Sequence, residues 1–122
     1  MASPSIFNKA KLSGSTDGNG IKVAATSSPG TTIHTAVSGT TANTYDEVWL
    51  YCVNTSTSAV KLTVEWGGTG SPDDQVEVTI PPESGLLEII PGLVLQNASL
   101  VRAFAGTTNV LVMHGYVNEI RP

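Results

Sequence analysis

The stretch EVWLYCVNTSTSAVKLTVEWGG, residues 47–68, contains two β-like runs separated by small hydroxyl residues. The second run alternates as a strand with a single buried face does. Its apolar set is Val60, Leu62, Val64 and Trp66, and its polar set is Lys61, Thr63 and Glu65. The first run is apolar on both faces. One face carries Trp49, Tyr51 and Val53, and the other carries Val48, Leu50 and Cys52. We expect the two runs to pair as a hairpin in which the first strand needs cover on both sides.

Similar runs recur from residue 20 to the C-terminus, rich in Val, Ile and Thr and separated by Gly, Pro, Asn and Ser. β-Branched residues suit a pleated surface, and the separating residues favour turns. No window sustains the apolar period of a helix. The pattern predicts an all-β sandwich or barrel of about eight antiparallel strands joined by short loops. We assign residues 21–122 to this single domain and residues 1–20 to an extended N-terminal arm.

The arm, MASPSIFNKAKLSGSTDGNG, has two large apolar residues in a polar, Gly-rich stretch. In one interpretation Ile6 and Phe7 anchor it on a neighbouring protein, while Lys9 and Lys11 face acidic groups there. In the other, the segment is an unstructured terminus, because its second half buries too little surface to offset the entropy of ordering.

Two strands with apolar residues on both faces indicate that part of the outer surface is covered. The last run, NVLVMHGYVNEI, shares this property with residues 47–54. Antiparallel sandwiches normally solvate their outer faces, and large exposed apolar patches mark interaction sites. The cover is either another subunit or a segment of the same chain. Trp66 is in phase with its strand's core residues and is expected inside, whereas Trp49 fits either side.

The charge composition excludes several classes of partner. Only 13% of residues are charged and the net charge is -4, whereas phosphate and anionic membranes require clustered Lys and Arg. We therefore predict no nucleic-acid or membrane partner. The N-terminus lacks the apolar core of a signal peptide, so we expect synthesis in the cytoplasm.

Catalytic and metal-binding motifs are weak in this sequence. His34 and His114 have no metal-ligand spacing around them, and Asp73–Asp74 lacks the regular spacing of a calcium loop. Cys52 lies in an apolar run and is expected to be a small core residue. We predict no enzymatic activity, no cofactor and no metal.

Two phrases, VNTSTSAVKLTVEWGG and IPGLVLQNASLV, carry a resemblance over residues 20–120. The chain resembles the small head decoration or cement proteins of tailed bacteriophages. This resemblance implies a jelly-roll-like sandwich, self-association with a trimer favoured, binding to the major capsid protein and a place on the capsid exterior. It transfers no site residues.

From the residues themselves we predict an interface with another protein, and the resemblance implies that this partner is the capsid or a sister subunit. This interface comprises Ile6, Phe7, Lys9, Lys11, Trp49, Tyr51 and Val53. The alternative function is a tail-associated or carbohydrate-binding β-sandwich module that uses exposed aromatic residues.

Overall fold

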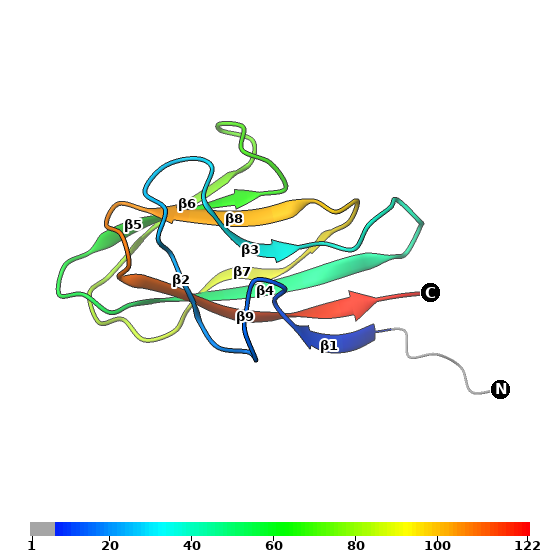
Figure 1. The fold of residues 1–122 in the computed structure, drawn as a ribbon, viewed down its shortest axis with the longest axis horizontal. Coiled ribbons are helices and arrows are strands. Elements are labelled where there is room, and N and C mark those ends of the chain that lie inside the picture. The colour runs from blue at the N-terminus through cyan, green and yellow to red at the C-terminus, as the bar shows by residue number, and fades with distance from the viewer. Residues whose placement is uncertain (1–6) are drawn as a thin grey trace.

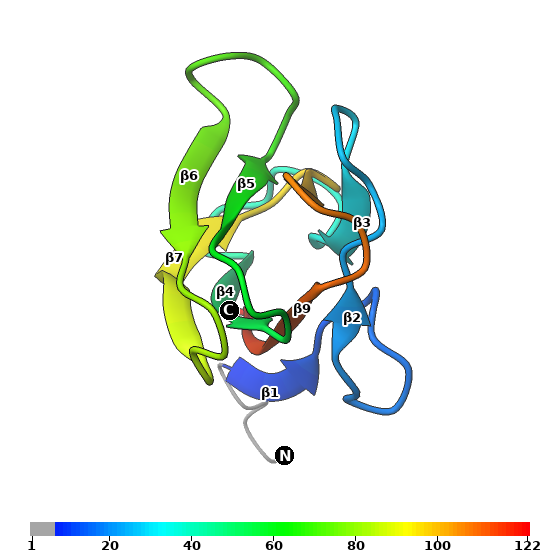
Figure 2. The ribbon, with the colours of Figure 1, turned by 90° about the vertical axis from the view of Figure 1, so that its left-hand side faces the viewer.

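The computed structural model describes residues 7–122, which form strands and no helix. Two antiparallel sheets pack face to face (Figure 1, Figure 2). The strands are β1 (Phe7–Lys11), β2 (Ile21–Lys22), β3 (Thr31–Thr35), β4 (Tyr45–Asn54), β5 (Val60–Trp66), β6 (Gln75–Ile80), β7 (Leu87–Leu95), β8 (Leu100–Ala105) and β9 (Leu111–Ile120). The predicted all-β sandwich is confirmed. Within the described residues there is no helix long and apolar enough to cross a membrane.

The strand connectivity is that of a jelly roll. The five-stranded sheet has the order β1–β9–β4–β7, with β2 also pairing with β9, and the four-stranded sheet has the order β3–β8–β5–β6. Strand β2 pairs with β9, β3 with β8, β4 with β7 and β5 with β6. This nested pairing, first with last and then inward, produces the two wrapped sheets of a jelly roll.

The expected hairpin between the two runs of residues 47–68 is wrong. Strand β4 pairs with β7 and β9 in one sheet, and β5 pairs with β6 and β8 in the other. The connecting residues 55–59 therefore cross from sheet to sheet. Asn54 fixes this crossing, because its buried Nδ2 donates to the carbonyl of Ser58 at 2.8 Å and to that of Ile80 at 3.0 Å.

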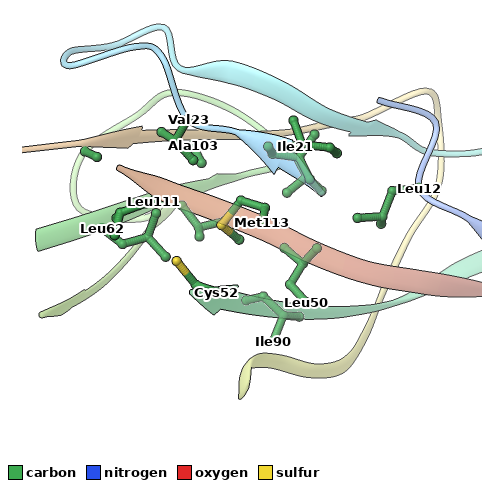
Figure 3. Close-up of a cluster of buried hydrophobic side chains, with 14 of the residues drawn as sticks. Leu12, Ile21, Val23, Leu50, Cys52, Leu62, Ile90, Ala103, Leu111 and Met113 are labelled. Carbon is green, nitrogen blue, oxygen red and sulfur yellow. The ribbon is translucent and has the colours of Figure 1, made fainter. Parts of the chain in front are cut away.

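The core lies between the two sheets (Figure 3). Its largest fully buried apolar side chains are Leu12, Ile33, Leu50, Leu62, Ile80, Ile90, Leu111 and Met113. Strand β4 contributes alternate residues to this core, with Val48, Leu50 and Cys52 all fully buried. The inner face of β4 is thus settled, and Trp49, Tyr51 and Val53 point outward.

Part of the predicted N-terminal arm belongs to the sandwich. Strand β1 pairs with the C-terminal half of β9, with Phe7 opposite Ile120 and Lys11 opposite Tyr116 (Figure 1). The segment after β1 is also anchored, since Leu12 is only 1% exposed. The expectation that this polar stretch buries too little to be ordered is therefore wrong, because one leucine reaches the core.

Residues 12–15 also close the free edge of β3. The backbone N–H of Gly14 donates to the carbonyl of Ile33 at 2.9 Å, and the N–H of Thr35 donates to the Ser13 hydroxyl at 2.7 Å. An unpaired edge invites pairing with another chain. This segment therefore removes one edge of the four-stranded sheet from the surface available to partners.

Candidate interaction surface

The outer face of the five-stranded sheet gathers aromatic and apolar side chains, and we call it the aromatic face. Its centre is formed by Trp49, Tyr51, Val53, Val112, His114 and Tyr116. These residues come from β4 and β9, where the register places Trp49 opposite Tyr116 and Tyr51 opposite His114. All six are partly buried rather than fully exposed.

The Trp49 ring is fixed on several sides. It stacks with Tyr116 at a centroid distance of 6.2 Å and an interplanar angle of 10°. Its indole N–H donates to Glu47 Oε1 at 2.8 Å, and Asn118 Nδ2 donates to the same oxygen at 2.9 Å. Gly92 supports the ring from β7, because a Cβ at this position would lie 2.7 Å from Trp49 Cζ2. Trp49 therefore presents a rigid platform whose only polar atom is already satisfied.

Acidic groups border the platform on β4 and β7. The hydrogen bond from Asn118, followed by that from Trp49, holds the pKa of Glu47 below its ordinary value. Partial desolvation raises the pKa of Tyr51, and the neighbouring Tyr116 and Glu88 raise it further. Glu88 pairs across the sheet with Tyr51 and is exposed.

Basic groups border the platform on β1 and β2. Lys9 places its Nζ 4.5 Å from the centroid of the Tyr116 ring, a cation–π contact. Lys11 pairs across the sheet with Tyr116, and Lys22 pairs with Val112. All three lysines are exposed.

The structure brings several of the predicted interface residues together. Trp49, Tyr51 and Val53 share the aromatic face, and Lys9 reaches it through Tyr116. The register places Phe7 at the end of this sheet, opposite Ile120. The prediction for Ile6 lies outside the described residues.

Sequence reasoning missed the polar residues that fix the platform. Glu47 and Asn118 lie opposite one another on β4 and β9, so Asn118 can donate to the Glu47 carboxylate that accepts the indole N–H of Trp49. Their positions in the sequence could have indicated this role. Asn118 is two residues after Tyr116, and Glu47 is two residues before Trp49, so each polar residue shares a strand face with its aromatic neighbour. That signal becomes useful only once β4 and β9 are known to be neighbours.

The predictions for Trp66 and Cys52 fit the structure. Trp66 is partly buried and packs against the core. Cys52 is fully buried, and burial raises the pKa of its thiol to about 12. The thiol therefore stays protonated, and only the thiolate is an effective nucleophile or metal ligand.

The two histidines have separate environments. His114 lies on the aromatic face, whereas His34 is buried with Asp46. His34 Nε2 lies 2.8 Å from Asp46 Oδ2, and its Nδ1 accepts the backbone N–H of Ser13 at 3.0 Å. Arg121 donates to Asp46 Oδ1 at 3.1 Å. Both ring nitrogens of His34 are thus occupied by the protein, so the cluster ties the N-terminal segment and the C-terminus to β3 and β4.

The acidic loop at Asp73–Asp74 stabilises its own turn. The backbone N–H of Gly70 donates to Asp74 Oδ2 at 2.9 Å, and the N–H of Trp66 donates to the Asp74 carbonyl at 2.7 Å. Residues 7–122 contain no group of three or more His, Cys, Asp or Glu that could hold a metal ion. No pocket was found in the structure over this part of the chain.

The aromatic face is therefore the most distinctive surface of the described chain. It combines fixed rings at the centre with exposed lysines along one edge and the exposed carboxylate of Glu88 at the other. Neither a protein-family profile, nor a curated protein, nor a solved structure matches this chain.

Proposed function

We propose that this protein is a structural virion protein of the decoration or cement type. In this role it binds the outside of a phage capsid lattice and stabilises it by bridging neighbouring capsid subunits. The aromatic face carries the proposal, because Trp49, Tyr51 and Tyr116 gather on a sheet surface that a sandwich ordinarily solvates. Trp and Tyr dominate the binding energy at the centres of protein interfaces.

Two further features support this role. The jelly-roll connectivity is frequent among viral capsid proteins, although lectins and cupins share it, so this support is an analogy at the level of fold. The resemblance to head decoration proteins adds the major capsid protein as partner, the capsid exterior as location and self-association, with a trimer favoured. No enzymatic step, nucleic acid or membrane enters the proposal.

Attachment in this proposal works through repetition. A capsid presents the same site many times, and each bound copy or oligomer engages more than one subunit. Simultaneous contacts raise the overall affinity far above that of a single contact when the geometry permits both. Modest individual interfaces on a surface with few charges are then sufficient for firm attachment.

The test mixes purified protein with undecorated capsids of the phage that encodes it. Cryo-electron microscopy is expected to show added density at symmetry-related sites on the capsid exterior. Trp49→Ala should remove most of this density, because it weakens the contact of the aromatic face with the capsid or with a sister subunit, while Phe104→Ala should preserve it. Phe104 is a matched control, since it is a partly buried aromatic residue of β8, on the four-stranded sheet. Capsids that stay bare at saturating wild-type protein would contradict the proposal.

The predicted contribution of the N-terminus to attachment is tested by deleting only residues 1–6 rather than the whole arm. Removing residues 1–6 leaves β1 and its pairing with β9 in place. If Ile6 contacts the capsid or a neighbouring subunit, occupancy on the capsid falls. Unchanged occupancy would show that this segment makes no contribution.

A second candidate function is carbohydrate binding through the same face. The observation that favours it is the near-parallel arrangement of the Trp49 and Tyr116 rings, with Glu47 and Asn118 beside them. A flat aromatic platform can stack on sugar rings while adjacent polar groups bind hydroxyls. Affinity electrophoresis in gels containing host-surface polysaccharide checks this candidate: retardation that Trp49→Ala abolishes supports it, and unretarded wild-type protein argues against it.

A further inference from the structure

Charges are sorted across the aromatic face along the direction perpendicular to the strands. The exposed lysines Lys11 and Lys22 lie on β1 and β2, which both flank β9 on the side away from β4. The exposed Glu88 lies on β7, at the opposite edge of the same sheet. Between them lie the aromatic side chains of β9 and β4.

This arrangement is complementary to itself under a two-fold rotation. In this arrangement a second copy lies face to face on the first. The two copies are related by a 180° rotation about an axis that runs parallel to the strands, midway between β4 and β9, in the plane of contact. Strands β1 and β2 of the second copy, with Lys11 and Lys22, then lie over β7 of the first copy, with Glu88, and its Tyr116 lies over the first copy's Trp49. The cross-strand pairs place Lys11 two residues to one side, and Lys22 two residues to the other side, of the level of Glu88 along the strands. Each Glu88 is thus bracketed by two lysines of the other copy.

We propose that the aromatic face binds a second copy of this chain in an isologous, two-fold pair. A uniformly acidic or basic partner would meet like charge at one edge, whereas a second copy meets opposite charge at both edges. Aligned sheet-on-sheet packing of this kind is a standard way for sandwiches to bury apolar faces. The inference rests on the self-association in the proposed function, replaces its favoured trimer by a two-fold pair, and leaves contact with the capsid to surfaces outside the aromatic face.

The area of the aromatic face determines how strongly the two copies are expected to bind each other. Four strands about 4.8 Å apart and nine residues at about 3.4 Å each give roughly 600 Å² per copy. Two copies then bury somewhat more than the roughly 1,000 Å² required of a specific interface. We therefore expect a dimer that dissociates on dilution and weakens with added salt, because its edge contacts are exposed ion pairs.

The experiment measures the mass of the full chain by sedimentation over a range of concentrations. Wild-type protein should shift from one chain to two as concentration rises. The variant K11E/K22E and the variant E88K should each dissociate at least about tenfold more readily, because like charges then face one another. An equimolar mixture of the two variants should recover the two-chain species, since position 88 of each copy then meets opposite charge at positions 11 and 22 of the other. Lys61→Glu, on the outer face of the four-stranded sheet, is the control and should leave the wild-type association unchanged.

The outcomes separate this inference from the proposed function. A chain that stays monomeric at all concentrations, a three-chain species, or a variant mixture that does not recover association each overturns the two-fold pair. Any of these results is compatible with capsid decoration. Conversely, a two-fold dimer that leaves undecorated capsids bare overturns the proposed function and leaves the pair standing.

Discussion

The outer face of the four-stranded sheet is covered in part by the chain itself, at Glu65, whereas Trp49, Tyr51 and Tyr116 on the aromatic face stay partly exposed. Residues 28–30 cross β8 beside Ala103 and reach β5, where Glu65 is fully buried although its side chain points away from the core. The Ser28 hydroxyl donates to Glu65 Oε2 at 2.5 Å, and the N–H of Gly30 donates to Oε1 at 2.7 Å. One outer face is therefore completed by a polar clamp, and the other ends in half-buried aromatic rings.

A glycine permits the close approach on each face. A Cβ on Gly30 would lie 2.5 Å from the backbone of Ala103, so only glycine lets the covering segment cross β8 this closely. Gly92 instead makes room for the Trp49 ring, and its φ of +81° lies in the region that favours glycine. The first glycine closes a surface within the molecule. The second glycine, Gly92, lets the Trp49 ring lie close to the sheet, where a partner can contact the ring.

The largest effect on stability is expected from a substitution at the covered part of the four-stranded sheet. Glu65→Ala removes the acceptor of two hydrogen bonds and leaves the N–H of Gly30 without its partner. We expect a loss of about 2–3 kcal/mol in the free energy of unfolding, since an unsatisfied buried donor costs about 1–3 kcal/mol and packing is lost as well. Urea denaturation measures this loss. Glu77→Ala, at a half-exposed position on the same face, is the control and should change stability by less than about 1 kcal/mol. Equal effects of the two substitutions would show that the hydrogen bonds from Ser28 and Gly30 to Glu65 do not stabilise the fold.

The next effect distorts the aromatic face without removing a ring. In Gly92→Ala the new Cβ meets Trp49 Cζ2 and Cε2 and also occupies an unfavourable φ. We expect the free energy of unfolding to fall by about 1–2 kcal/mol and the indole ring of Trp49 to be displaced. Near-ultraviolet circular dichroism should show a changed tryptophan signal together with weaker self-association. Gly39→Ala, which has a similar φ of +81° but open space around it, is the matched control. It should reproduce the stability loss from strain and leave the tryptophan signal unaltered.

Alternation along the sequence predicted directions of side chains well. The two sets of β4 residues lie on opposite faces as expected, although alternation left open which set faces the core, and the outward direction of Lys61, Thr63 and Glu65 on β5 is also right. Alternation does not, however, reveal what covers a face. Thr63 and Glu65 are both buried, and Glu65 is covered by Ser28 and Gly30, which bond to it from about 35 residues away in the sequence.

Strand partners were the less predictable part of the fold. Consecutive strands are neighbours in most folds, so a hairpin was the natural expectation for residues 47–68. Buried Asn54 instead bonds across to the end of β6, and the chain crosses between the sheets. The platform on the aromatic face was hidden for the same reason, because its hydrogen bonds join β4 to β9, about 70 residues later.

A smaller effect is expected from an exposed ion pair on the four-stranded sheet. Lys61 Nζ lies 2.8 Å from Glu77 Oε2, and both side chains are about half exposed. Lys61→Ala should therefore lower the free energy of unfolding by less than about 1 kcal/mol, with a reduced difference in high salt. A loss comparable to that of Glu65→Ala would mean that this outer face is held by its surface charges rather than by its covering segment.

The smallest and most local effect concerns the protonation of Glu47 on the aromatic face. Hydrogen bonds from Asn118 and then from Trp49 lower its pKa from the ordinary value of 4.5, and desolvation opposes them. A pKa lowered by folding means that the charged carboxylate stabilises the folded state. This contribution is complete above the unfolded value and is lost as the pH falls from there through the lowered folded value. The carboxyl carbon of Glu47, followed by nuclear magnetic resonance, should titrate below the ordinary range, and Asn118→Ala should move its pKa upward. If Asn118→Ala leaves the titration unchanged, Glu47 does not hold the Trp49 platform through this shared hydrogen bond, and the aromatic face is fixed by packing alone.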